Sequence, residues 1–204
     1  YLINAVKPEN KHLEKKSVAE IAKIRNQDII DAFLDLSLEE GLDTEFQTSS
    51  TNGDEKAVAE IIRSPYVLVG QSDAGAHLIY DAGFGYATRL LGYWVREKQI
   101  MSLEEGVRKL TFMVASIFGL PNRGLLRKGM AADLCLFDPS TVREGDAVMV
   151  QDLPGNEKRF IQRATGIEMT IVNGEVLVEK DQHTGALPGA VLGGGNGHSL
   201  QAAA

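Results

Sequence analysis

The sequence is poor in the residues that mark several common classes of protein. It has a single cysteine, Cys135, in 204 residues, so no disulfide can form within the chain and a reducing, cytoplasmic location is expected. Lysine and arginine number 21 against 28 acidic residues, a net charge of −7, which argues against a surface for nucleic acid or anionic membrane. No apolar run is long enough to span a membrane. We therefore expect neither nucleic acid nor membrane as a partner.

Metal ligands are also scarce. The chain has only four histidines, and it contains no His-x-His pair, no His-Glu-x-x-His motif and no cluster of soft ligands. It begins at Tyr1 rather than at a methionine, from which we expect a chain trimmed at its N-terminus. Any metal chemistry would need ligands from elsewhere.

Caps and apolar periodicity predict the helices. Ser17 and Glu20 have the spacing of a capping box, and Ser102 with Glu105 repeats it. Helices are expected from residue 17, over 28–40, after 52–55 as far as 64, over 88–98 and over 102–118. Gly41 and Gly119 are the expected stops of two of them.

Apolar runs between turn signals predict the strands, over residues 44–50, 66–70, 133–137, 167–172 and 175–179. The last two flank Asn173-Gly174, a strong hairpin signal. Strand, helix, strand over 44–70 predicts a βαβ unit with parallel strands. We expect an α/β fold with a boundary after residue 121, a small antiparallel segment over 122–192 and a flexible Gly/Ala-rich tail over 193–204.

The most informative segment is residues 66–77. An apolar run ends in Ser72, Asp73 and His77, which are separated by glycine and alanine. The carboxyl ends of buried parallel strands are where α/β proteins collect catalytic groups. Asp73 could there serve as a general base or a metal ligand, or it could merely make a local turn with its own backbone. His77 could join the same site or be a surface residue.

Ser72 offers a different chemistry. The sequence Gly70-Gln-Ser72-Asp-Ala nearly matches the nucleophile elbow of α/β-hydrolases, and His183 would complete the order serine, acid, histidine. The elbow requires a helix directly after the serine. The glycine-rich sequence that follows here argues against such a helix.

Several stretches together resemble the C-terminal portion of the amidohydrolase superfamily, specifically the D-aminoacylase or N-acyl-D-amino-acid deacylase branch. They are Ser72-Asp73, the helix from Ser102 to Thr111, the stretch from Arg123 to Pro139, the Asn173-Gly174 hairpin and the sequence from His183 to Gly189. The resemblance covers the chain from about Ser17 to Leu192.

The resemblance implies the C-terminal part of a metal-dependent-hydrolase (β/α) barrel over residues 1–121, followed by a small antiparallel β-sandwich segment. It implies zinc as cofactor, a small N-acylated amino acid as substrate, and Asp73 as the acid and base that moves a proton from water to the leaving nitrogen. Asp73 could also touch the metal, and Ser72 and His77 could contact substrate. The remaining ligands and the N-terminal half of the barrel are expected upstream, so the chain is expected to be a fragment. The alternative is a non-catalytic amidohydrolase-like scaffold.

Overall fold

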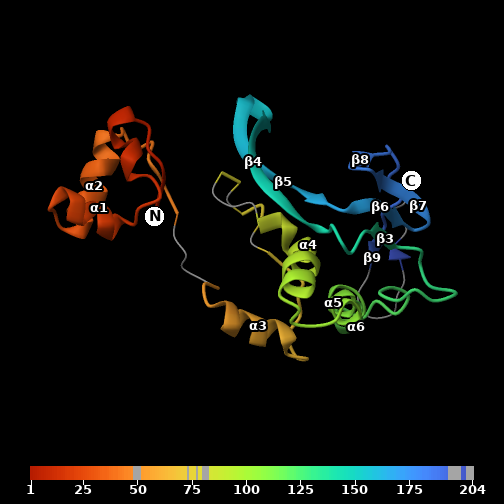
Figure 1. Cartoon of the computed structure of the whole chain (residues 1–204). Coiled ribbons are helices and arrows are strands. Elements are labelled where there is room, and N and C mark those ends of the chain that lie inside the picture. The colour runs from red at the N-terminus through yellow and green to blue at the C-terminus, as the bar shows by residue number, and fades with distance from the viewer. Residues whose placement is uncertain (48–51, 73, 77, 80–82, 193–198, 201–204) are drawn as a thin grey trace. The chain divides into compact units, whose positions relative to one another are not determined.

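The computed structural model describes residues 1–47, 52–72, 74–76, 78–79, 83–192 and 199–200 (Figure 1). The chain divides into two compact units, residues 1–55 and 56–204. Both units contain helices and strands, so the α/β class predicted from the sequence is confirmed. In the parts of the chain that the structure describes, no helix is long and apolar enough to cross a membrane.

The first unit is built around a short antiparallel pair of strands. β1 (Leu2–Asn4) pairs with β2 (Glu45–Phe46). Between them lie the 3-10 helix η1 (Pro8–Leu13), α1 (Val18–Arg25) and α2 (Ile29–Glu39). The core of this unit comes from β1, the helices and the chain between them, and consists of Leu2, Ala5, Leu13, Ile21 and Leu36.

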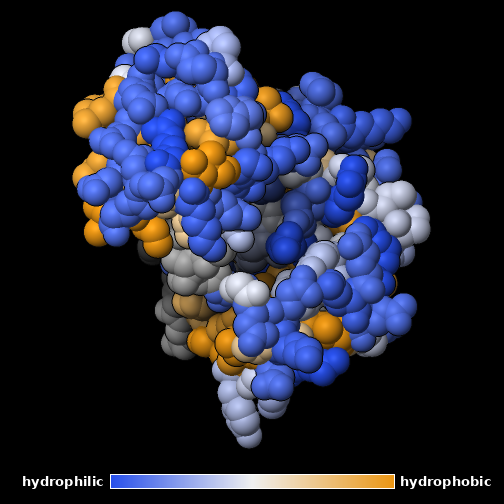
Figure 2. All heavy atoms as spheres, turned by 60° about the vertical axis from the view of Figure 1, so that its left-hand side comes forward, coloured by the Kyte–Doolittle hydropathy of each residue, from blue (hydrophilic) through white to orange (hydrophobic). Residues whose placement is uncertain are grey.

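The capping box predicted for the first of these helices is confirmed, and the second helix has a cap as well. Ser17 and Glu20 form the reciprocal capping box of α1, and Asp28 caps α2 by accepting from the N–H of Ile30 at 2.8 Å. Several large apolar side chains of α2 are, however, at the surface: Ile30 is 67% exposed. Only Ala32 and Leu36 of this helix are buried. Figure 2 shows such hydrophobic side chains among hydrophilic ones on the molecular surface.

Glu40, directly after α2, is a buried acid with a complete set of donors. Its carboxylate accepts from the backbone N–H groups of Val6 and Lys7 and from the side-chain amide of Asn10. Burial opposes ionisation of Glu40, but these hydrogen bonds outweigh it and hold its pKa below the ordinary value. The carboxylate therefore ties the end of α2 to the start of η1.

The second unit begins with helices. They are α3 (Glu55–Arg63), the 3-10 turn η2 (Gly83–Gly85), α4 (Tyr86–Arg89), the π-helix η3 (Leu90–Glu97), α5 (Leu103–Leu110) and α6 (Phe112–Ile117). The single helix expected over 102–118 is thus broken at Thr111, which has φ −123° and ψ −84°. The Thr111 hydroxyl donates to the carbonyl of Val107 at 2.7 Å, a bond that bends helices.

The strands of the second unit are antiparallel. A four-stranded sheet has the order β3 (Leu134–Phe137), β6 (Ile167–Val172), β7 (Glu175–Glu179), β8 (Gln182–His183). A long hairpin inserted between β3 and β6 consists of β4 (Arg143–Leu153) and β5 (Glu157–Thr165), with the 3-10 turn η4 (Pro154–Asn156) at its tip. A short pair is formed by β9 (Val191–Leu192) and β10 (Ser199–Leu200).

The turn between β6 and β7 confirms the hairpin prediction. Asn173 and Gly174 both have positive φ, 49° and 86°, as this type of turn requires. The side chain of Asn173 accepts from Arg123 at 2.8 Å and donates to the carbonyl of Pro188 at 2.7 Å. The backbone N–H of Asn173 donates to Asp133 at 2.7 Å. One turn therefore ties three other segments to the sheet.

The β4–β5 hairpin packs on α4 and η3, and its course across these helices can be followed in Figure 1. Arg96 of η3 donates to the carbonyl of Val142 at 2.6 Å, just before β4. Arg89 of α4 pairs with Glu144 of β4. Gly92 of η3 has no room for a side chain, since a Cβ there would lie 2.4 Å from the carbonyl oxygen of Val142. Helices and hairpin are thus in direct backbone contact.

The strand predicted over residues 66–70 and the βαβ unit are wrong for this structure. Residues 66–70 form no strand, and Tyr66 is 93% exposed. β2 pairs with β1 in the antiparallel sense instead of with a later parallel strand. An extended segment becomes a strand only where a neighbour pairs with its N–H and C=O groups, and the described residues provide none beside 66–70.

Candidate functional site

Of the three residues singled out by the sequence, the structure describes only Ser72. Asp73 and His77 lie outside the described residues, and their roles stay predictions. Ser72 is half-buried, and its hydroxyl accepts from the backbone N–H of Ala74 at 3.3 Å. This is a local turn of the kind that serine favours. The site is therefore built from the described segments on either side of Asp73.

Before the candidate residues, the chain is held by a buried lysine. Lys109 of α5 is fully buried, and its ammonium group donates to the carbonyls of Ser64 at 2.7 Å and Val67 at 3.2 Å. Burial lowers the pKa of Lys109. The two carbonyls lie at the exit of α3, so α5 fixes the start of the segment that leads to Ser72.

After the candidate residues, the chain is held by strand β5. The backbone N–H of Phe160 donates to the carbonyl of Leu78 at 2.7 Å. The side-chain oxygen of Gln162 accepts from the N–H of Gly85 at 2.8 Å, and its amide nitrogen donates to the carbonyl of Gly145 at 3.0 Å. The stretch with Ser72, Asp73 and His77 thus lies, in sequence, between one anchor on α5 and another on β5.

The serine-hydrolase alternative finds no support in the described residues. Residues 74–76 and 78–79 form turns and bends rather than the helix that a nucleophile elbow needs. The Nδ1 atom of His183 accepts from the N–H of Gly185 at 2.9 Å, and no hydrogen bond joins His183 to Ser72. The two side chains do not form a catalytic pair in this structure.

The described residues do not fit a zinc ion either. Within the described ranges, no three His, Cys, Asp or Glu side chains come together in a way that could hold a metal. His12 in the first unit is paired with the carbonyl of Glu9 at 2.7 Å, and Cys135 lies exposed on β3. A catalytic zinc ion needs about three such ligands at one point, with water in the fourth position. No metal-dependent step can therefore be derived from these residues.

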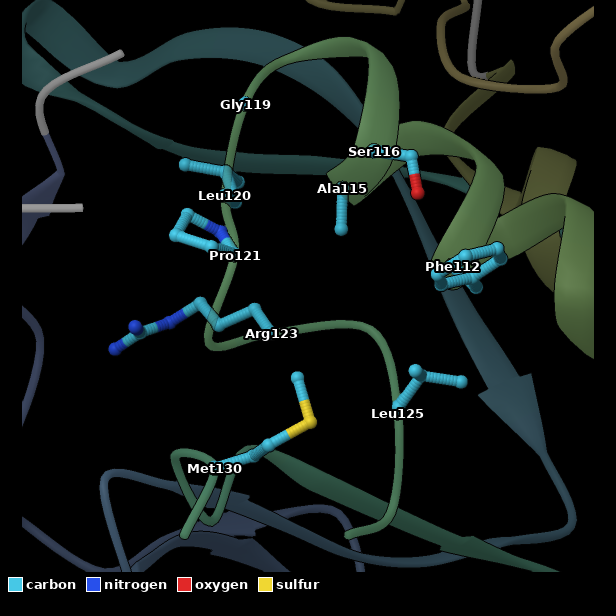
Figure 3. A pocket seen from close by; sticks show the side chains of 9 residues that line it. All are labelled: Phe112, Ala115, Ser116, Gly119, Leu120, Pro121, Arg123, Leu125 and Met130. Atoms are coloured by element: carbon cyan, nitrogen blue, oxygen red, sulfur yellow. The ribbon is translucent and has the colours of Figure 1, made fainter. Parts of the chain in front are cut away.

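Two neighbouring pockets lie against α5, α6 and the loop that follows. One, of about 320 Å³, is shown in Figure 3: Met130 and Leu125 face Phe112 and Ala115 across it. The guanidinium group of Arg123 points away from this space, toward its partners Asp133 and Asn173. The other, of about 460 Å³, shares Phe112 and Leu125 with it. Both are lined mainly by apolar side chains, and the second also has Glu104 and Arg108 in its lining.

A third pocket, of about 390 Å³, is polar and lies between η3 and the β4–β5 hairpin. It is lined by Tyr93, Glu97, Arg143, Glu144, Gly145, Asp146, Ala147 and Gln162. None of these three pockets is lined by residues 64–79. Of the groups that hold the candidate segment, only Gln162 reaches one of them.

Sequence reasoning missed the two anchors. Lys109 looked like one more charge on an amphipathic helix, and nothing in its local pattern marks it as buried. The β4–β5 hairpin carried a signal, since Pro154-Gly155-Asn156 is a turn sequence between two runs with alternating apolar residues. Which segment Gln162 would contact depends on tertiary packing.

Comparison with known proteins identifies the family. A model of the amidohydrolase family matches residues 13–178. The N-acyl-D-aspartate deacylase of Alcaligenes xylosoxydans xylosoxydans is 33% identical over 147 residues, which is 70% of this chain and 27% of that protein. The N-acyl-D-glutamate deacylase of the same organism is 35% identical over 125 residues, 59% of this chain and 23% of that protein.

A crystal structure of D-aminoacylase, described as defining a novel subset of amidohydrolases, has a TM-score of 0.47 and 28% identity, covering 91% of this chain and 36% of that one. The chain thus spans about a quarter of the length of the two deacylases. The family match covers most of this chain and includes the segment with Ser72 and Asp73. The chain belongs to the amidohydrolase family, in the branch of the D-aminoacylases.

Proposed function

We propose that the complete protein containing this chain hydrolyses the amide bond of an N-acyl-D-amino acid, releasing a D-amino acid and a carboxylate. The observation that carries the proposal is the family match over residues 13–178, which includes Ser72-Asp73. The names of the two deacylases support this substrate class. Amide hydrolysis is the reaction class that the family membership supports best.

Asp73 is the proposed acid and base. Its carboxylate takes a proton from the attacking water as the water oxygen bonds to the amide carbon. It then gives that proton to the nitrogen as the C–N bond breaks, so the amine leaves neutral and the acid product keeps the oxygen. General acid-base catalysis of this kind contributes about 10²–10⁴-fold to a rate. Ser72 and His77 are proposed to contact the substrate.

Zinc is the proposed cofactor, and when bound it would supply activation of the water. The described residues do not provide its ligands, so those ligands, apart from a possible contact with Asp73, are proposed to come from the rest of the protein. This division of the site is supported by the small share of the two deacylases that the chain covers. This chain would contribute Asp73, Ser72 and His77 to the site, in the roles proposed above.

We likewise propose that residues 1–121 contribute the C-terminal part of a (β/α) barrel and residues 122–192 a small β-sandwich segment. The antiparallel sheet β3-β6-β7-β8 supports the second part of this assignment. The barrel assignment concerns the apolar segment over 67–69, which is only half-buried in this structure. A strand needs neighbours on both sides in a barrel, and the remaining part of the protein is the proposed source of those neighbours.

The test is Asp73→Asn in the complete protein. We expect turnover of N-acetyl-D-aspartate, N-acetyl-D-glutamate or an apolar N-acetyl-D-amino acid to fall by about 10²–10⁴-fold, measured as release of free amine. Asp181→Asn is the matched control: Asp181 is exposed in the β7–β8 turn with φ 63°, a conformation that asparagine tolerates. Near-normal turnover in Asp73→Asn, with the control also active, would refute the assignment.

A second candidate function, a non-catalytic scaffold, is favoured by one observation: the described residues show no group that could hold a metal. The zinc content of the complete protein separates the two readings. A scaffold with a degenerate site should retain no zinc after dialysis, whereas the enzyme should hold at least one ion per chain. A serine hydrolase would instead be labelled at Ser72 by a fluorophosphonate.

A further inference from the structure

The chain carries the same chemically reactive dipeptide at two described positions. Asparagine followed by glycine occurs at Asn52-Gly53 and at Asn173-Gly174, and a third copy, over 196–197, lies outside the described residues. Asparagine is a thermolabile residue. Because glycine has no Cβ, its backbone nitrogen stays open to approach by the side chain of the asparagine before it. The two described copies therefore have the same intrinsic chemistry.

The two sites also share their backbone conformation and their exposure. Asn52 has φ 56° and Asn173 has φ 49°, both in the left-handed region. Both asparagines are exposed to solvent. A Cβ added at Gly53 or at Gly174 would meet no atom within 4 Å. Neither backbone angle, exposure nor steric access therefore distinguishes one site from the other.

Hydrogen bonding does distinguish them. At the turn between β6 and β7, both ends of the Asn173 side-chain amide and the N–H of Gly174 are hydrogen-bonded to other segments of the chain. Across the described ranges, by contrast, no hydrogen bond is made by the side chain of Asn52 or by the N–H of Gly53, just before α3. The reacting groups are thus held apart at one site and free to meet at the other.

We propose that Asn52 is a site of spontaneous covalent modification in the folded protein, whereas the fold protects Asn173. The backbone nitrogen of Gly53 bonds to Cγ of Asn52, and the bond from Cγ to the side-chain nitrogen breaks. The proton of the Gly53 N–H leaves with that nitrogen as ammonia. Water then adds to either carbonyl carbon of the cyclic imide and breaks its bond to the Gly53 nitrogen, which regains a proton. The products are aspartate and isoaspartate.

The modification changes the connection between the two compact units. Each modified chain gains one negative charge at residue 52, which lies close in sequence to the boundary after residue 55. In the isoaspartate product the main chain runs through the side-chain methylene group, so the connection is lengthened by one carbon atom. This inference does not depend on the proposed function.

The experiment incubates the complete protein in a mildly alkaline buffer and follows both sites over time. Asn52 and Asn173 fall in different tryptic peptides, and chromatography with mass spectrometry separates their asparagine, aspartate and isoaspartate forms. In the folded protein we expect conversion at Asn52 to be at least about tenfold faster, the ratio that an opening free energy of only about 1.4 kcal/mol at Asn173 would produce. In denaturing urea the hydrogen bonds of Asn173 are lost, so the two sites should convert at similar rates.

Gly53→Ala is the matched control. Its new Cβ would meet no neighbouring atom, so the fold should be kept, but the methyl group obstructs the approach of the nitrogen to the side chain. Most of the conversion at Asn52 should be lost, with Asn173 unchanged. Equal conversion at the two sites in the folded protein would overturn the proposal, as would an Asn52 that converts only in urea. A difference that persists in urea would also overturn it, since neighbouring residues rather than hydrogen bonds would then set the rates.

Discussion

The buried carboxylate of Glu40 allows a sharp test of what holds the first unit together. Three donors converge on it, the N–H groups of Val6 and Lys7 and the side-chain amide of Asn10. Glu40→Gln keeps the shape of the side chain but replaces one accepting oxygen with an NH₂ group. That group must face one of the donors, so at least one buried hydrogen bond is lost and replaced by a contact between two donors.

The size of the effect follows from these contacts. A hydrogen bond to a charged group contributes about 1.5–3 kcal/mol, and leaving a buried donor unsatisfied costs about 1–3 kcal/mol. We therefore expect Glu40→Gln to lower the free energy of unfolding by about 2–4 kcal/mol at pH 7. Urea denaturation followed by circular dichroism measures this as a lower midpoint with an unchanged slope.

Glu39→Gln is the control, because it is the same change one residue earlier. Glu39 is exposed and pairs with Arg25 at 2.8 Å, a surface ion pair that contributes about 0–1 kcal/mol. Equal losses of stability in the two variants at pH 7 would refute the reasoning.

The pH dependence gives a second check on Glu40. Its pKa is lowered in the folded state, so the unfolded chain binds the proton first as the pH falls. The contribution of the carboxylate to stability is thus complete above about pH 4.3, the ordinary pKa of glutamate. It is lost below that value, and the difference between wild type and Glu40→Gln should shrink there.

Two further predictions concern the second unit. Gly166→Ala should lower the free energy of unfolding by about 2–3 kcal/mol, because φ is +77° and the new Cβ would lie 2.6 Å from the backbone nitrogen of Val142. Gly174→Ala, at φ +86° with open space around it, should cost only about 1 kcal/mol in the same urea titration. Lys109→Met should raise protease sensitivity around residues 64–67, since it leaves two carbonyls without their donor; cleavage unchanged from wild type would contradict this.

Local signals in the sequence predicted the local structure well. The capping box at Ser17 and the Asn173-Gly174 turn are found as predicted, because each depends on atoms within a few residues. The break at Thr111 is also local, but a threonine hydroxyl bonding back to Val107 is compatible with both a bent and a continuous helix.

The features that could not be predicted from the sequence depend on which segments become neighbours in the folded protein. Residues 66–70 have the pattern of a buried strand, yet they are not one, since no paired strand lies beside them in the described structure. The hydrogen bonds of Lys109 and Gln162 join residues that are far apart in the sequence. Lys109 is 45 positions from Ser64, and Gln162 is 77 positions from Gly85. Of the candidate site, the sequence predicted the residues that would do the chemistry, and only the structure reveals the anchors on either side of them.

The turn at Asn173 has a consequence for the chemical ageing of the protein. Asparagine is a thermolabile residue, and one followed by glycine is open to attack on its side-chain amide by the next backbone nitrogen. Here the amide is bonded at both ends, by Arg123 and Pro188, while the nitrogen of Gly174 is engaged with the carbonyl of Ala132 at 3.0 Å. Deamidation at this position therefore requires the turn to open first, so the combined fraction of aspartate and isoaspartate accumulated at position 173 is a chemical record of how long the sheet has spent unfolded.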